Sequence, residues 1–204
     1  MRPPDGVAHW TGALDAAAQR ALLGDVRAVL DQAPLFRPTM PRSGRPFSVE
    51  MSNCGVLGWV SDAAGYRYQP RHPVTGAPWP PMPLRLLALW TLYSGFAAPP
   101  EACLINVYRA GAKLGSHVDS DEPEARAPVL SVSLGDTAVF HVGGRSRRDP
   151  KVKLSLHSGD VLLIGGASRR AYHGIDRVLA GSSNLVEGGG RINLTLRRVT
   201  LAPS

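Results

Sequence analysis

The 204-residue sequence has only two cysteines, Cys54 and Cys103, and they lie far apart along the chain. They form neither a CxxC pair nor the paired spacing of a zinc site, which excludes a disulfide scaffold and a zinc finger. Isolated cysteines of this kind are typical of reduced thiols in a cytosolic protein, so we expect a cytoplasmic location.

Long apolar runs are also missing. The most apolar stretch, residues 86–98, is short and is interrupted by polar side chains and a glycine, so it cannot span a bilayer. The N-terminal residues include Arg2, two prolines and Asp5, and they lack the apolar run of a secretory signal. We therefore expect no membrane partner.

Lysine is scarce and occurs only at positions 113, 151 and 153, yet the formal net charge is +7 because arginine is abundant. The chain is 44% hydrophobic and 19% charged, which is within the globular range, and its length suits one domain with a sizeable core. A basic surface favours phosphate-bearing partners. An arginine-rich genome would give the same excess without such a partner.

Helical signals come first along the chain and β-type alternation follows. Asp15 can cap a helix that runs to about Gln32, and a second helix is expected from about Pro83 to Tyr93. Residues 35–82 are expected to form short strands and loops. The later alternation predicts eight short strands, a number that suits a jelly roll. They are residues 103–108, 113–119, 128–134, 137–142, 152–157, 159–164, 170–175 and 191–199.

The most informative motif is His117-Val118-Asp119, followed much later by His173. If residues 117–119 are extended, the side chains at i and i+2 point to the same side of a sheet. Two histidines and one carboxylate form the facial triad of non-heme Fe(II) oxygenases, which leaves metal positions open for other ligands. Because the motif is short, structural or surface roles for these three residues are the alternative.

Residues 191–197 alternate strictly between polar and apolar side chains. The polar face carries Arg191, Asn193, Thr195 and Arg197. If this face points inward, both arginines are buried and need anions, because an unpaired buried charge is costly. The planar guanidinium binds both oxygens of a carboxylate, so a small dicarboxylate such as 2-oxoglutarate would meet this need. An edge strand with a solvated polar face is the alternative.

In residues 103–108 the alternation places Leu104, Asn106 and Tyr108 on one side of a strand. Asn106 and Tyr108 could donate hydrogen bonds to the same ligand, whereas an ordinary strand is the alternative. Taken in order, Asn-x-Tyr, His-x-Asp, His and Arg-x-Asn-x-Thr-x-Arg make a highly specific combination.

This combination resembles the AlkB-type DNA alkylation-repair dioxygenases over about residues 13–200. The resemblance implies a mainly β (α+β) fold, a double-stranded β-helix or jelly roll with N-terminal helices and a substrate-binding lid. It implies one domain over residues 1–204, with the helices and a nucleotide-recognition lid in 13–100 and the catalytic core in 101–200. The matching segments are residues 51–55, 58–59, 65–68, 102–108, 111–114, 117–123, 132–135, 172–175 and 191–197.

The resemblance also implies Fe(II), 2-oxoglutarate and O2 as cofactor and cosubstrates. The implied reaction is oxidative demethylation of N1-methyladenine and N3-methylcytosine, preferentially in single-stranded DNA, with formaldehyde release by a monomer. The implied metal ligands are His117, Asp119 and His173. The implied 2-oxoglutarate ligands are Asn106, Tyr108, Arg191, Asn193 and Arg197, with Arg191 on the far carboxylate and Arg197 near the chelating end.

Candidate substrate contacts lie outside the metal motif. Asp121 and Glu122 could face the exocyclic amine of a cationic methylated base and favour it over the neutral base, whereas a solvated turn is the alternative. Trp59 and Tyr66 could stack on an extruded base with added cation–π attraction, whereas core packing is the alternative. By resemblance, Tyr68 matches a further lid position.

A basic run covers residues 145–153 and includes Arg147, which matches a family position. Such a loop could follow a nucleic-acid backbone, and Arg169 and Arg170 could extend the same surface. A solvated charged hairpin is the alternative.

Ile164 and Ser120 depart from the family pattern, since they stand where close relatives carry Trp and Lys, and the Gly-rich loop at 181–190 also differs. The departures put oxygen access and substrate range in question. An RNA or tRNA base demethylase of the same family is an alternative, since stacking and phosphate contacts serve both nucleic acids, and a non-catalytic nucleic-acid-binding relative is another. A hydroxylase of peptides or small molecules is a further alternative, but it would leave Trp59, Tyr66 and the basic run without a purpose.

Overall fold

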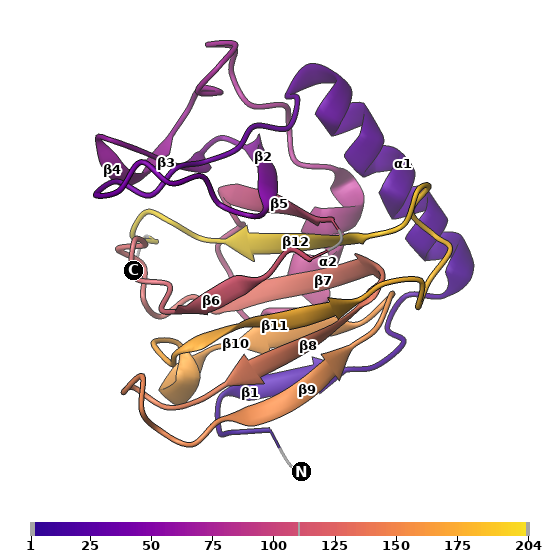
Figure 1. The fold of residues 1–204 in the computed structure, drawn as a ribbon, viewed down its shortest axis with the longest axis vertical. Coiled ribbons are helices and arrows are strands. Elements are labelled where there is room, and N and C mark those ends of the chain that lie inside the picture. Colours follow the sequence, from indigo (N-terminus) through magenta and orange to yellow (C-terminus); the bar gives the residue numbers. More distant parts are fainter. Residues whose placement is uncertain (1–2, 110, 203–204) are drawn as a thin grey trace.

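The computed structural model describes residues 3–109 and 111–202, whose strands form two antiparallel sheets and a separate hairpin (Figure 1). The six-stranded sheet contains, in spatial order, β1 (Val7–Trp10), β10 (Val161–Ile164), β7 (Val129–Gly135), β12 (Arg191–Arg197), β5 (Ala102–Tyr108) and β2 (Glu50–Gly55). The four-stranded sheet contains β6 (Leu114–His117), β11 (His173–Leu179), β8 (Thr137–Val142) and β9 (Val152–Leu156). The hairpin joins β3 (Gly58–Asp62) and β4 (Gly65–Gln69).

The two sheets pack face to face. One buried cluster contains Tyr108 and Ile164 from the larger sheet together with Phe140, Leu156 and Ile175 from the smaller one. Side chains from both inner faces therefore fill the same interior, as in β-sandwich folds. The predicted β-rich architecture of two opposed sheets is confirmed.

Both predicted helices are present, as α1 (Ala16–Gln32) and α2 (Leu84–Tyr93). The carboxylate of Asp15 accepts a hydrogen bond from the backbone N–H of Ala18 at 2.8 Å, which satisfies a donor at the start of α1. Within the described ranges, neither helix is long and apolar enough to cross a membrane.

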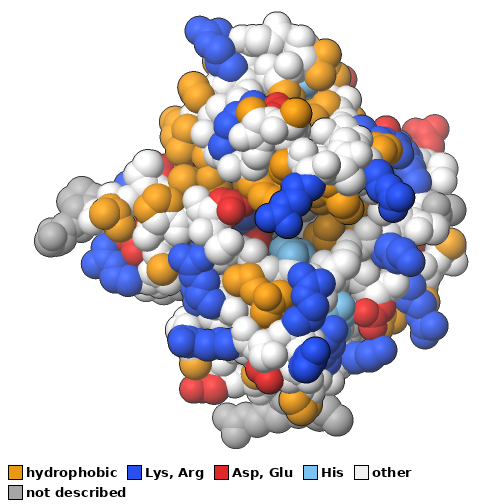
Figure 2. Space-filling view, turned by 60° about the vertical axis from the view of Figure 1, so that its left-hand side comes forward, with side chains coloured by type: hydrophobic (Ala, Val, Ile, Leu, Met, Phe, Trp, Pro, Cys, Tyr) orange, Lys and Arg blue, Asp and Glu red, His pale blue; other side chains and the backbone are white. Residues whose placement is uncertain are grey.

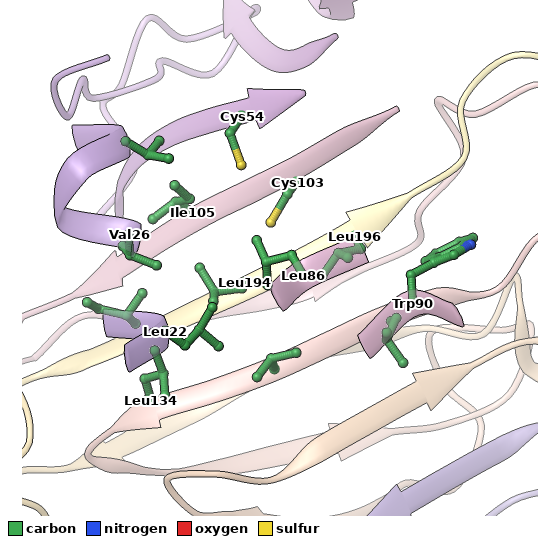
Figure 3. Close-up of a cluster of buried hydrophobic side chains, with 14 of the residues drawn as sticks. Leu22, Val26, Cys54, Leu86, Trp90, Cys103, Ile105, Leu134, Leu194 and Leu196 are labelled. Atoms are coloured by element: carbon green, nitrogen blue, oxygen red, sulfur yellow. The ribbon is translucent and has the colours of Figure 1, made fainter. Parts of the chain in front are cut away.

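A second buried cluster lies between the helices and the outer face of the larger sheet. Figure 3 shows Leu22 and Val26 of α1 and Leu86 of α2 directed toward Ile105 and Leu194 of β5 and β12. Burying each Leu contributes about 1.5–3 kcal/mol relative to an exposed side chain. The apolar face of β12 is thus committed to this core, and its polar face is directed to the space between the sheets.

Three differences from the predicted strands matter for the site. β6 ends at His117, so Asp119 lies just beyond the strand and not within it. β11 begins only at His173, later than the predicted start at residue 170, because residues 169–170 lie in a turn that follows the short 3-10 helix at 166–168. The strand β1 was not predicted, and it pairs along β10 at the edge of the larger sheet.

Candidate metal and cosubstrate site

The two histidines of the motif lie opposite each other, since His117 at the end of β6 is the register partner of His173 at the start of β11. One ligand atom from each histidine and one from Asp119 lie within 4.8 Å of one another. The Nε2 atoms of His117 and His173 are 3.7 and 3.6 Å from the two carboxylate oxygens of Asp119. The structure therefore brings the three predicted metal ligands together.

Both imidazoles are oriented by the backbone. Nδ1 of His117 lies 2.9 Å from the carbonyl oxygen of Gly115, and Nδ1 of His173 lies 2.9 Å from that of Ala171. A carbonyl oxygen only accepts, so each Nδ1 donates and each Nε2 keeps a free lone pair. Burial lowers the pKa of His173 to about 4, so this ring is neutral near pH 7, as a metal ligand must be.

The donor set fits a divalent metal ion. Oδ2 of Asp119 is buried and has no hydrogen-bond partner in the described part of the chain. A buried charged oxygen without a partner is costly, and a metal ion between it and two free imidazole nitrogens would remove that cost. Two imidazoles and one carboxylate are the ligands of non-heme Fe(II) centres.

The other oxygen of Asp119 is occupied by Arg197. Nη2 of Arg197 donates to Oδ1 of Asp119 at 2.9 Å, and its Nη1 donates to Oε1 of Glu122 at 2.8 Å. Burial raises the pKa of Asp119, but the positive charge of Arg197 together with those of the neighbouring histidines and Arg169 outweighs burial and holds this pKa well below its usual range. Asp119 is thus ionised, and the guanidinium of Arg197 is paired with carboxylates of the protein itself.

Arg191 is buried more completely, and no carboxylate of the described residues forms an ion pair with it. Its Nη2 donates to the Oγ of Ser133 at 2.8 Å and to Oδ1 of Asn193 at 3.1 Å, whereas its Nε has no partner among the described residues. Burial lowers the pKa of Arg191 to about 10. The expectation that both arginines need an external anion was wrong for Arg197, which is paired within the protein, and it stays a prediction for Arg191.

Residues expected to bind the cosubstrate lie close together in the sheet. In the pairing of β12 with β5, Arg191 is opposite Tyr108 and Asn193 is opposite Asn106. Oδ1 of Asn106 is buried and has no partner in the part of the chain that the structure describes. Asn106, Tyr108, Asn193 and Arg197 line one cavity, and Arg191 lies fully buried beside them.

This cavity has a volume of about 690 Å³ and also contains the metal triad. Figure 2 shows a hollow with apolar and histidine side chains, surrounded by arginine and lysine side chains. The lining includes residues that the sequence analysis did not single out, and its apolar part contains Ile164, one of the departures from the family pattern. These additional lining residues include Val129, Ser131, Phe140, Leu156 and Leu162.

The β3–β4 hairpin contributes the aromatic wall. Trp59 and Tyr66 stack with ring centroids 5.6 Å apart and an interplanar angle of 17°. Nε1 of Trp59 donates to Oδ2 of Asp121 at 2.8 Å, and all three residues line the cavity. Tyr66 is 52% exposed, so its outer face is accessible to a planar ligand.

Tyr68 and Glu122 do not line the cavity, unlike their neighbours Tyr66 and Asp121. Glu122 is only 1% exposed, and its two oxygens accept hydrogen bonds from Tyr68, Arg197 and Arg169. The structure thus places these two predicted substrate contacts in a buried network behind Asp119.

The basic residues near the cavity divide into two kinds. Arg147, in the loop between β8 and β9, lines the cavity and lies 5.2 Å from the ring centroid of Tyr172. Arg169 is buried against Glu122, so the expectation that it extends the basic surface was wrong. Its location could not be read from the sequence, because burial depends on a carboxylate distant along the chain.

Comparison with known proteins gives a consistent result. Residues 6–197 match the family model described as the 2OG-Fe(II) oxygenase superfamily. The chain is 56% identical to an alpha-ketoglutarate-dependent dioxygenase AlkB homolog of Caulobacter vibrioides, over 95% of this chain and 87% of that protein. It is 45% identical to the alpha-ketoglutarate-dependent dioxygenase AlkB of Escherichia coli, over 91% and 86% of the two chains.

A solved structure agrees with the fold. The structure of OsALKBH1 superposes with a TM-score of 0.81 at 28% identity, covering 97% of this chain and 99% of that one. The jelly-roll prediction and the predicted use of Fe(II), 2-oxoglutarate and O2 are thereby confirmed. The chain belongs to the 2OG-Fe(II) oxygenase superfamily and, within it, to the AlkB-type alpha-ketoglutarate-dependent dioxygenases.

Proposed function

We propose that this dioxygenase removes methyl groups from N1-methyladenine and N3-methylcytosine in single-stranded DNA. The observation that carries the proposal is the position of Asp121, which is held by Trp59 at the wall of the cavity that contains the metal triad. A carboxylate beside stacked aromatic rings suits a planar cationic base whose exocyclic amine donates a hydrogen bond.

His117, Asp119 and His173 would hold the iron, and the uncompensated charge of Arg191 supports it as the partner of the far carboxylate of 2-oxoglutarate. Asn106, Tyr108 and Asn193 would complete the cosubstrate site, with Arg197 between it and Asp119. Bound Fe(II), 2-oxoglutarate and O2 supply the oxidation that inserts oxygen into a C–H bond, giving succinate and CO2.

The protein's own task is to select and orient the base. Trp59 and Tyr66 would stack on the extruded base, and Asp121 would accept from its amine. After hydroxylation of the methyl group, the C–N bond breaks and its electron pair remains on the ring nitrogen. Formaldehyde leaves, the hydroxyl proton passes to solvent, and the base becomes neutral.

The phosphate backbone would follow the basic rim. Arg147 lines the cavity, and its loop carries further arginines and lysines on either side. Such contacts position the strand without reading its sequence. We also propose that residues 1–204 form a single domain and that the protein acts as a monomer in the cytoplasm. Light scattering of the purified protein would test the oligomeric state.

The test is formaldehyde release from matched DNA and RNA oligonucleotides that carry one N1-methyladenine, with an unmethylated strand as the blank. We expect faster release from DNA, and loss of release in His117→Ala. Faster release from RNA would replace the DNA proposal with an RNA demethylase. Full activity of His117→Ala would contradict the metal assignment.

A further inference from the structure

Glu122 has a position that the reaction scheme does not use. It lies three residues after Asp119 in the loop that follows β6, is 1% exposed and does not line the cavity. Its Oε1 accepts from the hydroxyl of Tyr68 at 2.5 Å and from Nη1 of Arg197 at 2.8 Å, and its Oε2 accepts from Nη2 of Arg169 at 3.0 Å. One carboxylate thus joins donors from β4, from β12 and from the segment that leads to His173.

Both of these arginines also reach Asp119. Nη2 of Arg197 donates to Oδ1 of its side chain at 2.9 Å, and Nη1 of Arg169 donates to its backbone carbonyl at 3.0 Å. Each guanidinium therefore bridges Glu122 and Asp119, one to the side chain and the other to the main chain. The side chain and the main chain of Asp119 are thus both held, and its Oδ2 stays without a hydrogen bond to the described residues and lies 3.6 Å from Nε2 of His173.

The charges of this network balance. Two buried carboxylates, Asp119 and Glu122, compensate two buried guanidiniums, Arg169 and Arg197. Without the charge of Glu122, two cations would share the single carboxylate of Asp119. That carboxylate would then be drawn toward the arginines, because removing one partner of a buried ion pair leaves an uncompensated charge.

We infer that Glu122 is a positioning residue of the metal centre, which fixes Arg197 and Arg169 so that these orient Asp119 toward the metal. The inference rests on the proposed assignment of His117, Asp119 and His173 as the metal ligands. Residues that orient metal ligands typically change metal affinity by about 10- to 100-fold when mutated.

The same network ties the β3–β4 hairpin to the metal centre. Trp59 and Tyr68 are register partners in the hairpin, and they donate to the consecutive acids Asp121 and Glu122. One acid lies at the cavity and the other behind it. The position of the hairpin therefore affects the orientation of the Asp119 carboxylate through Tyr68, Glu122 and Arg197. We expect metal affinity to depend on the hydroxyl of Tyr68 for this reason.

Titration of the metal-free full-length protein with Co(II), followed by its visible absorption, tests the inference without turnover. Glu122→Gln should bind Co(II) at least about 10-fold more weakly than the unchanged protein. Asp121→Asn is the matched control, since it alters the adjacent acid on the cavity side and should stay within about twofold. A folded Glu122→Gln protein, judged by circular dichroism, that binds Co(II) like the unchanged protein would overturn the inference.

If Glu122→Gln does not fold, two variants that each remove a single hydroxyl group test the role of the network in metal binding. Tyr68→Phe removes only the hydroxyl that donates to Glu122, and Tyr66→Phe removes an exposed hydroxyl from the same hairpin. We expect several-fold weaker Co(II) binding for Tyr68→Phe and no change for Tyr66→Phe, whereas equal affinities would contradict the role of the network. His117→Ala separates this from the metal assignment itself, because unchanged Co(II) binding there would refute the triad and the inference together.

Discussion

The indole Nε1 of Trp59 donates a 2.8 Å hydrogen bond to Oδ2 of Asp121, which joins the β3–β4 hairpin to the loop after β6 that carries Asp119. The bond orients the carboxylate and leaves Oδ1 of Asp121 without a hydrogen bond to the described residues. A donor on a bound base can use this free oxygen. The hairpin and the loop after β6 thus form one recognition surface.

Asp121→Asn should lower kcat/KM for an oligonucleotide with N1-methyladenine by about 5- to 150-fold, since one such base contact contributes about 1–3 kcal/mol. The amide is neutral, so its attraction to a cationic base is lost. The KM for 2-oxoglutarate should not change. Steady-state kinetics with each substrate varied in turn measures both, and an unaltered kcat/KM for the oligonucleotide would count against base recognition by Asp121.

Arg191→Met should weaken 2-oxoglutarate binding by about 10- to 150-fold, because hydrogen bonds to charged groups contribute about 1.5–3 kcal/mol. The melting temperature without ligand should stay the same or rise, since Arg191 is a buried charge with no carboxylate partner in the described structure. Thermal unfolding with and without 2-oxoglutarate and Mn(II) gives both values. A variant that 2-oxoglutarate stabilises as much as the unchanged protein would contradict this role.

Arg147→Ala should weaken binding of methylated and unmethylated single strands equally, because a phosphate contact carries no base information. The slope of log affinity against log salt should decrease by about 1. Arg20→Ala is the control, since Arg20 lies on α1, which packs against the outer face of the larger sheet. Fluorescence anisotropy at several salt concentrations measures the slopes, and equal slopes for all three proteins would exclude Arg147 from the contact.

A bidentate ion pair joins the two strands of the β3–β4 hairpin next to its turn, with Nη1 and Nη2 of Arg67 donating to Asp62 at 2.9 and 2.8 Å. Hydrogen bonding from Arg67 lowers the pKa of Asp62 from 3.8 to about 2. Because the folded pKa is lowered, the pair stabilises the hairpin above pH 3.8, and this contribution is lost as the pH falls through about 2. An NMR titration of Asp62 should show this pKa, and Arg67→Gln should return it toward 3.8; identical titrations would refute the pairing.

Much of the site could be predicted from alternation within strands. In β5 and β12 a period of two decides which side chains share a face, so the sequence could group Asn106 with Tyr108 and Arg191 with Asn193. The pairing of the two strands then brings Arg191 opposite Tyr108. The polar Ser131 interrupts an apolar strand, and this signal could have identified it as part of the cavity wall.

In loops the sequence does not indicate which way each side chain points. Beyond the end of β6 at His117 no periodicity relates neighbouring side chains, so the sequence could not show that Asp121 faces the cavity and Glu122 the interior. Nor could it show the pairing of Arg169 with Glu122 or of β1 with β10, because both depend on contacts between distant segments. These are the parts of the molecule that tertiary packing alone determines.

The most direct test of the account is the molar ratio of succinate to formaldehyde formed on a single-stranded oligonucleotide with one N1-methyladenine. The account predicts nearly equal amounts of both products, dependent on Fe(II) and 2-oxoglutarate, with unmodified adenine left in the strand. Succinate without formaldehyde, with the methyl group still in place, would show that the cavity oxidises 2-oxoglutarate but does not recognise this base.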